Sequence, residues 1–159
     1  MPFVRSRLDA ALFDRISRLR GVRAEERTRT ELDGLRGRGF VVVHGVEQIG
    51  GGAIDHFVSG STGLFLINAR HRRYRDEHLR ETWRRAADLI QELHTWVTPV
   101  ICLAESSWGK PVREEKVWVV RGDQIADWIE RQRNPVLEYE RVAFLADRLG
   151  QPTEPTPVS

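Results

Sequence analysis

The sequence predicts an α/β fold, in the broader sense that includes α+β, with a mixed five-stranded sheet flanked by helices. Three apolar runs rich in β-branched residues follow one another with glycine clusters between them, which is typical of antiparallel strands joined by tight connections. A long amphipathic stretch then separates these runs from two further apolar runs. A helix of that length can cross the sheet and bring the next strand in parallel.

The first part of the chain predicts two helices and three strands. Apolar residues recur at helical spacing over Arg7–Arg20, and a second, strongly charged helix is expected over Ala24–Leu35. The glycines of "GRG", Gly37–Gly39, then end the helical pattern. The three strands that follow are predicted at Phe40–Val46, Ala53–Ser59 and Gly63–Ala69.

The second part predicts a long helix, two strands and two more helices. Apolar residues recur at intervals of three and four over Asp76–Trp96, as in an amphipathic helix. Nearly all residues of Thr98–Ala104 are apolar, and Glu115–Arg121 has the apolar centre "VWVV", so both are expected to be buried strands, joined by a polar loop. A short helix around Ile125 and a last one over Val136–Leu149 complete the prediction.

Length and composition limit the classes of protein that need to be considered. The 159 residues suffice for one domain with a real core, and the formal net charge is only +2. We expect a helical extension over residues 1–22, a domain over residues 23–150 and a disordered tail over residues 151–159. The sequence predicts neither a secretion signal nor a membrane span, so a cytoplasmic location is expected.

Several segments together resemble the nuclease-related domain (NERD) family, which has the restriction-endonuclease-like fold. These segments are "EERTRTELDGL", "GFVVVHGV" and "AIDHFVSGSTGLFLINARH", followed by the long helix and "VWVVRGDQIADWI". The resemblance extends over residues 24–149 and keeps the order of the elements. It implies a restriction-endonuclease-like sheet and a site in which carboxylates hold a divalent cation beside a lysine.

Transferred position by position, the resemblance places this site at Glu26, Asp55, Asn68 and Arg70. Glu26 and Asp55 match the expected acids, whereas asparagine and arginine replace the third acid and the lysine. By this resemblance the metal ligands would be Asp55, Asn68 and Glu26. The cofactor would be Mg²⁺ or Mn²⁺ if the site is active, and otherwise none.

The two replacements change what the site can do. Asn68 keeps an oxygen that can bind a cation but removes one negative charge, and Mg²⁺ is usually bound through carboxylates. Arg70 can stabilise a phosphate, but it does not deprotonate and therefore cannot act as a base. Strand alternation puts both residues on one face, near Asp55 on the neighbouring strand. The alternative role of Asp55 is an ion pair with Arg70.

Basic residues gather where the third strand ends and the long helix begins. Only two of the 25 basic residues of the chain are lysines, and the arginine fork suits phosphate groups. The residues predicted to bind nucleic acid are Arg70, Arg72, Arg73, Arg75 and Arg80, together with Trp108 and Lys110 of the polar loop. The alternative is a solvated helix face held by pairs of Glu81 with Arg84 and Arg85, which explains the loop arginines less well than it explains Arg84 and Arg85.

The sequence therefore predicts a nucleic-acid-binding protein of nuclease fold, with absent or weak metal-dependent phosphodiesterase activity and DNA as its partner. One alternative is an active Mg²⁺- or Mn²⁺-dependent nuclease that tolerates the Asn-Ala-Arg sequence of residues 68–70. Another is a scaffold or regulatory domain that uses the fold to bind a protein partner or a second copy of itself.

Overall fold

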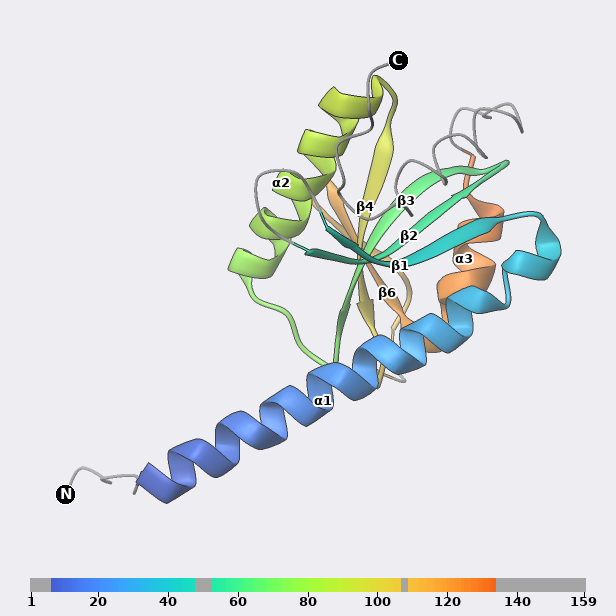
Figure 1. Cartoon of the computed structure of the whole chain (residues 1–159). Coiled ribbons are helices and arrows are strands. Elements are labelled where there is room, and N and C mark those ends of the chain that lie inside the picture. The colour runs from blue at the N-terminus through green and yellow to red at the C-terminus, as the bar shows by residue number, and fades with distance from the viewer. Residues whose placement is uncertain (1–6, 48–52, 107–108, 134–159) are drawn as a thin grey trace, which may run out of the picture.

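In the computed structural model, which describes residues 7–47, 53–106 and 109–133, a mixed sheet lies between helices (Figure 1). The strands are β1 (Val41–Glu47), β2 (Ala53–Gly60), β3 (Gly63–Arg70), β4 (Val97–Leu103), β5 (Val112–Glu114) and β6 (Val117–Arg121). The α-helices are α1 (Arg7–Asp33), α2 (Asp76–Leu93) and α3 (Ile125–Arg131), and the short 3-10 helices are η1 (Arg36–Arg38) and η2 (Gly122–Gln124). The predicted α/β class and mixed sheet are confirmed.

The strand order is β1-β2-β3-β4-β6-β5. β1, β2 and β3 form the predicted antiparallel meander. The chain then crosses through α2, so that β4 runs parallel to β3, with Leu64 opposite Val97. β6 joins β4 in parallel on its other side. The crossover helix therefore delivers the fourth strand as its length predicted.

The sheet has six strands, so the prediction of five is wrong. The additional strand, β5, lies within the segment expected to be a polar loop, and it pairs with β6 in antiparallel register, Val112 opposite Val119. It is only three residues long and largely exposed, at the edge of the sheet. Such a strand forms because β6 offers unpaired backbone groups. Because the strand stays exposed, it needs no run of apolar residues.

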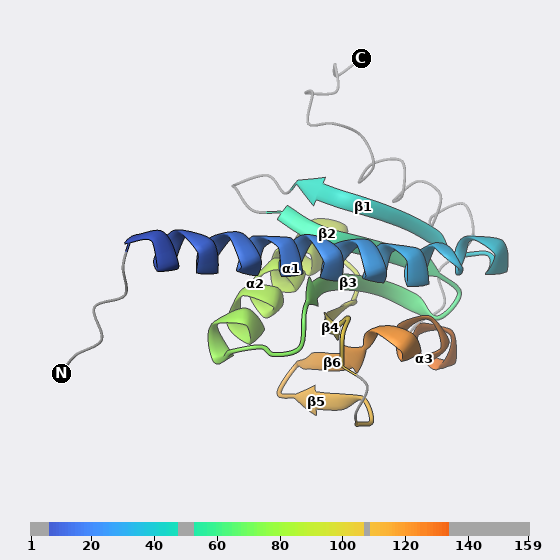
Figure 2. The same cartoon turned by 90° about the horizontal axis from the view of Figure 1, so that it is seen from below.

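Helices cover both faces of the sheet. On one face, Leu32 of α1 and Ile125 and Ile129 of α3 join a core with residues from β1, β2, β3, β4 and β6. On the other face, Leu89 of α2 packs in a second core that includes Phe57. Figure 2 shows α1 running across β1, β2 and β3. The third-strand residues therefore lie between helices from distant parts of the chain.

α1 is one continuous helix, so the prediction of two helices is wrong. It runs from Arg7 to Asp33 through Gly21, whose position has no heavy atom near enough to require a glycine. A single glycine in a helix costs only about 1 kcal/mol relative to alanine, which the flanking turns offset. Gly39, with φ of +86°, does end the helical region where the sequence predicted.

Three predicted features lie outside the described residues: the helix over Val136–Leu149, the tail over residues 151–159, and Trp108. Cys102 is buried as predicted, and burial raises the pKa of its thiol to about 12, so the thiol is unreactive. No helix among the described residues combines the length and apolar character needed to cross a membrane.

Candidate functional site

Asp55 and Asn68 lie side by side where β2 and β3 begin to separate. They are one residue beyond the last strand pair, His56 with Ile67. The Asp55 backbone N–H donates to Asn68 Oδ1 at 3.3 Å, and the Ala69 backbone N–H donates to Asp55 Oδ2 at 2.9 Å. Both side chains are thus held in place by the backbone of the opposite strand.

The Asp55 carboxyl is partly shielded from water. Burial raises its pKa, because a charge is solvated less well inside the protein than in water. The hydrogen bond from Ala69 opposes this rise, the carboxylate of Glu25 on α1 adds to it, and the charges of Arg70 and Arg85 oppose it. A partly buried acid with a shifted pKa is a common feature of functional sites, although ion-pair networks produce it as well.

A small cavity of about 160 Å³ opens at these residues. Its lining comes from β2, β3, β4 and α2: Asp55, Asn68, Ala69, Arg70, His78, Glu81, Thr82, Arg85 and Ile101. Two acidic and two arginine residues therefore border the same space, and their formal charges cancel. Glu81 already forms an ion pair with Arg85, at 2.7 Å, as the sequence predicted for the face of this helix.

The groups around this cavity do not fit a divalent metal ion. Mg²⁺ and Mn²⁺ favour hard oxygen ligands, with carboxylates to balance their charge. Here Asp55 Oδ2 and Asn68 Oδ1 each accept a backbone N–H, Asn68 Nδ2 donates to Thr82, and two arginines lie nearby. Within the described ranges, no group of three or more His, Cys, Asp or Glu side chains is placed to hold a metal.

Glu26, the acid that the resemblance assigned to the site, lines neither this cavity nor the larger one described below. Its side chain is exposed on α1. The preceding residue, Glu25, is half-buried, and its charge acts on Asp55. One residue along a helix turns the side chain by about 100°, and this turn decides which of the two glutamates faces the sheet.

Arg70 lies at the edge of the small cavity without pairing with Asp55. Among the described residues, no ion pair within 4.0 Å joins these two side chains, although the charge of Arg70 lowers the pKa of Asp55. The alternative role of Asp55, an ion pair with Arg70, is therefore not formed as a direct contact. Arg70 also lines the neighbouring cavity, so this residue borders both spaces.

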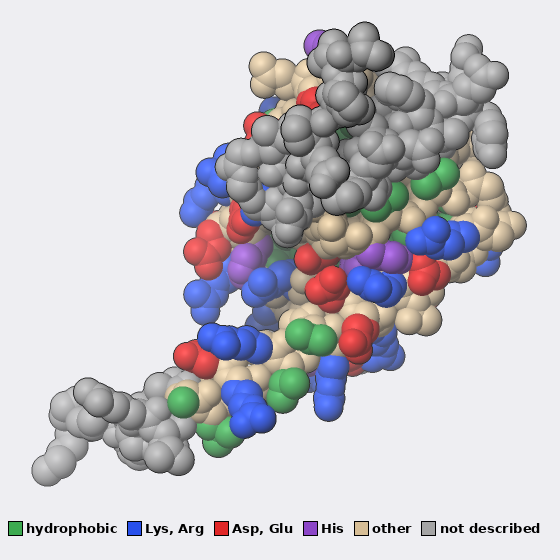
Figure 3. Space-filling view, in the orientation of Figure 1, with side chains coloured by type: hydrophobic (Ala, Val, Ile, Leu, Met, Phe, Trp, Pro, Cys, Tyr) green, Lys and Arg blue, Asp and Glu red, His purple; other side chains and the backbone are tan. Residues whose placement is uncertain are grey.

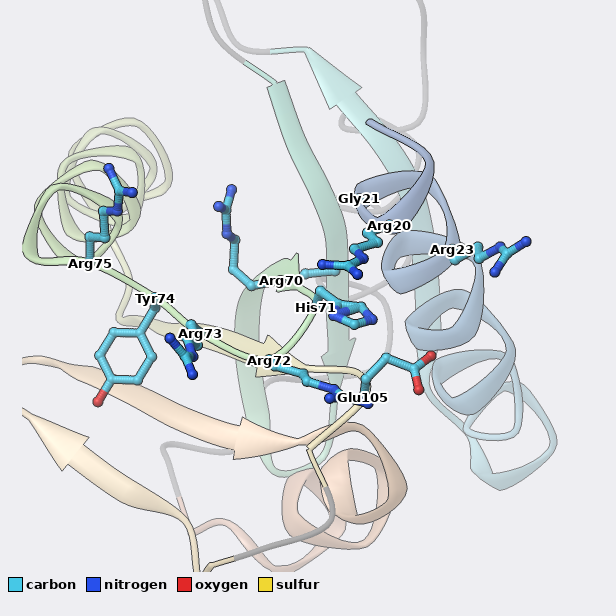
Figure 4. A pocket seen from close by; sticks show the side chains of 11 residues that line it. Arg20, Gly21, Arg23, Arg70, His71, Arg72, Arg73, Tyr74, Arg75 and Glu105 are labelled. Atoms are coloured by element: carbon cyan, nitrogen blue, oxygen red, sulfur yellow. The ribbon is translucent and has the colours of Figure 1, made fainter. Parts of the chain in front are cut away.

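The second cavity is much larger, about 920 Å³, and strongly basic. Figure 4 shows its lining, which comes from α1, from the end of β3 and the loop between β3 and α2, and from the segment after β4. The lining residues are Arg20, Gly21, Arg23, Ala69, Arg70, His71, Arg72, Arg73, Tyr74, Arg75 and Glu105. We call this space the arginine-lined cavity.

Backbone hydrogen bonds fix the floor of the arginine-lined cavity. The β3–β4 pairing continues past the strand ends, since Ala104 N–H donates to Arg70 O at 2.9 Å and Glu105 N–H donates to His71 O at 2.8 Å. Further along the loop, the Tyr74 hydroxyl donates to Glu114 Oε1 of β5 at 3.1 Å. The loop arginines therefore extend from an anchored backbone.

Glu105 is the one carboxylate in this lining, and it is already paired. Its Oε2 lies 2.5 Å from Nη1 of Arg27, an exposed residue of α1. The hydrogen bond from Arg27 lowers the pKa of Glu105, which keeps the carboxylate ionised. Six arginines around one cavity are thus left with a large excess of positive charge.

The predicted nucleic-acid-binding residues divide into two groups. Arg70, Arg72, Arg73 and Arg75 gather at the arginine-lined cavity. Arg80 and Lys110 are exposed but do not line it, and Trp108 is outside the described residues. The sequence interpretation missed Arg20 and Arg23, which are three residues apart and so lie on the same side of α1.

In comparisons with known proteins, no protein-family model, no curated protein and no solved structure matches the chain. The resemblance to the nuclease-related domain family accordingly stays a prediction.

Proposed function

We propose that the chain binds the phosphate backbone of nucleic acid, with DNA as the first candidate, in the arginine-lined cavity. The neighbouring nuclease-type site has weak metal-dependent activity or none. The observation that supports the binding proposal is the gathering of six arginines around one space, from α1 and from a distant segment that comprises the end of β3 and the β3–α2 loop.

The kind and number of charges favour a polyanion as the ligand. Each guanidinium remains charged and offers a planar set of N–H donors that matches the oxygens of a phosphate. The two arginines of α1 and the loop arginines line different parts of a space of about 920 Å³. A single small anion would contact few of them, whereas a nucleic-acid backbone presents phosphates in series.

The composition of the small cavity supports weak or absent catalysis. A metal-dependent nuclease requires a cation to polarise the phosphate and activate water. Asp55 is the one acid of the transferred set that lines the space, and Arg70 cannot accept a proton. Asp55 and Asn68 would then help to fix the strand ends that carry the arginines, through their hydrogen bonds to the opposite backbone.

Binding is tested by a gel-shift assay with a labelled DNA duplex at low salt. The double variant Arg72→Gln/Arg73→Gln removes two arginines of the cavity. Its matched control, Arg84→Gln/Arg131→Gln, removes the same charge at exposed positions outside it. We expect the cavity variant to weaken binding at least about 10-fold and the control to change it little. Equal losses in both variants would contradict binding in this cavity.

Catalysis is tested separately by nicking of supercoiled plasmid with Mg²⁺, Mn²⁺ or EDTA. The variants are Asp55→Ala and the double variant Asn68→Asp/Arg70→Lys, which restores the acid and the lysine. We expect no efficient nicking by the wild type and a gain of metal-dependent nicking in the double variant. Wild-type cleavage that disappears with EDTA and in Asp55→Ala would establish an active nuclease and contradict this part of the proposal.

A further inference from the structure

The size of the arginine-lined cavity limits the kind of nucleic acid that can enter it. Its volume of about 920 Å³ is that of a cube with edges of about 10 Å, whereas the major groove alone of a duplex is about 12 Å wide. A duplex can therefore contact the rim of the cavity but cannot lie inside it. A single strand, whose backbone is one chain with its bases free, can do so.

Arginines line the cavity from two sides. Arg20 and Arg23 belong to α1, and the other four arginines belong to the end of β3 and the loop that follows it. Figure 3 shows Lys and Arg side chains on both sides of the hollow between α1 and α2. The phosphates of a strand that lies between these two sides can be contacted from both of them.

One end of the cavity leads to aromatic side chains. Figure 4 shows Tyr74 at one end of the lining. Tyr74 also packs, together with Leu79 and Trp83 of α2, on the core of β4 and β6. Its hydroxyl donates to Glu114 of β5. Tyr74 therefore belongs both to the cavity and to the face of the sheet beside α2.

Trp96 is the exposed aromatic residue on this side of the molecule. It is 39% exposed, and its ring centroid lies 6.1 Å from that of Trp83, with an angle of 38° between the two ring planes. Its Nε1 donates to Thr98 Oγ1 at 3.0 Å, which fixes the orientation of the indole. We call Tyr74, Trp83 and Trp96 the aromatic row. Packing on the core explains the first two, which are half-buried, but not the exposure of Trp96.

Cations lie beside the aromatic row. Lys116 Nζ is 4.3 Å from the centroid of the Trp83 ring. Arg80, which was predicted to bind nucleic acid but does not line the cavity, is exposed three residues before Trp83, on the same side of α2. Glu114 and Glu115 balance these two charges. The row therefore offers surfaces on which bases can stack, whereas the net positive charge is in the cavity.

We propose that the arginine-lined cavity takes a single strand of nucleic acid rather than a duplex, and that bases leaving it at Tyr74 stack on the aromatic row. This inference rests on the proposed function, because it requires phosphates bound in the cavity. The continuity of the row with the cavity through Tyr74 favours a nucleic-acid strand over a protein partner. Each stacked base contributes about 10-fold or more to affinity, and it does so without releasing counterions.

Fluorescence anisotropy with a labelled DNA strand of roughly 15 nucleotides, and with the duplex of the same sequence, tests the preference. We expect the wild type to bind the strand about 10-fold or more tightly than the duplex. Trp96→Leu should weaken binding of the strand about 10-fold, change binding of the duplex little, and leave the slope of log K against log salt unchanged. Trp96→Phe is the matched control, because it keeps an aromatic ring, and should retain most of the affinity.

Tryptophan emission provides a second measurement. The strand should quench it in the wild type, and part of this quenching should be missing in Trp96→Phe, whose circular dichroism spectrum reports its folding. Equal or tighter binding of the duplex would overturn the inference. So would a Trp96→Leu variant that binds both forms like the wild type, which would assign the row to a protein contact, or undiminished quenching in Trp96→Phe.

Failure of the proposed function has a different signature. In that case Arg72→Gln/Arg73→Gln binds both strand and duplex as tightly as the wild type, or the wild type binds neither. If the cavity variant weakens both forms while Trp96→Leu changes neither, phosphate binding in the cavity stands and the inference about the aromatic row is wrong.

Discussion

At Asp55, a partly buried carboxylate that is useful in a functional site lowers the stability of the fold. Burial raises the pKa of its carboxyl, which means that the ionised form is less favourable in the folded chain than in the unfolded chain. The contribution of this group to stability is thus greatest below its unfolded pKa and is lost as the pH rises through its folded pKa. At neutral pH, the charge of Asp55 destabilises the fold.

We therefore predict that Asp55→Asn stabilises the protein at neutral pH, by about 0.5–2 kcal/mol. Asparagine keeps an oxygen to accept the N–H of Ala69 but carries no charge to desolvate. Urea unfolding of the variant and the wild type measures the difference, with Asp88→Asn on exposed α2 as control. The gain should shrink in acid, where the wild-type carboxyl is protonated. A variant less stable than wild type at neutral pH would refute this prediction.

His56 is a second residue whose burial controls its protonation. It is fully buried, and its Nδ1 lies 2.7 Å from Nδ1 of His44, whose Nε2 lies 2.7 Å from Oδ1 of Asp33. Burial lowers the pKa of His56 to about 3, and the charges of His44 and Arg29 add to the effect. His56 is consequently neutral in the folded chain over a wide range of pH.

This gives a pH dependence with a defined sign. Between about pH 6.5 and pH 3 the unfolded chain binds a proton at His56 that the folded chain does not. The free energy of unfolding should therefore fall as the pH falls through this window, with His56 supplying about 1.4 kcal/mol per pH unit. Chemical unfolding at several pH values checks this. His56→Gln should reduce the slope and exposed His94→Gln should not, and an unchanged slope in His56→Gln would contradict the assignment.

At the scale of the element, α1 combines two halves with different surroundings. The second half packs on the sheet through fully buried side chains such as Leu32. The first half extends beyond the sheet, with Leu12 exposed. The same residue type therefore contributes differently to stability in the two halves.

We predict that Leu32→Ala lowers the free energy of unfolding by about 2–5 kcal/mol, because it leaves a cavity in the core. Leu12→Ala is the matched substitution at an exposed position, and it should change stability by less than about 0.5 kcal/mol. Thermal or urea unfolding of dilute protein distinguishes them. Similar losses in both variants would mean that the first half of α1 packs on the folded body.

The sequence predicted most elements because burial leaves a periodic pattern. The strands of the meander and β4 and β6 are apolar, and α2 repeats its apolar residues at helical spacing, so each was found. β5 was missed because a three-residue edge strand depends on the backbone of β6 rather than on its own side chains. The sequence predicted two helices where α1 is one, because the apolar residues of its two halves lie on opposite sides of the helix and form two separate patterns.

Of the site, the sequence predicted only the contacts that follow from the pairing of neighbouring strands. Strand alternation was enough to place Asp55 beside Asn68. Arg20 and Arg23 could not be predicted, since their place at the arginine-lined cavity depends on how α1 crosses the end of β3. Glu26 is exposed and Glu25 half-buried because of the way α1 is rotated about its axis against the sheet. Both are consequences of tertiary packing, which a single sequence does not specify by pattern.

At the scale of the whole molecule, the net charge gives little indication of the cavity. A formal charge of +2 predicts weak general attraction to nucleic acid, but six arginines are concentrated at one cavity where α1 meets the β3–α2 loop. Local concentration of like charge, rather than the sum over the chain, sets the field that a polyanion meets. We therefore predict that removing charge at the arginine-lined cavity weakens DNA binding more than removing equal charge elsewhere.

The measurement that tests this most directly is the salt dependence of DNA affinity, followed by fluorescence anisotropy between about 50 and 200 mM salt. Each arginine–phosphate contact that is lost reduces the slope of log K against log salt by about 1. We predict that Arg72→Gln/Arg73→Gln reduces the slope by about 2, while Arg84→Gln/Arg131→Gln leaves it as in the wild type. Equal slopes for the wild type and the cavity variant would contradict the account.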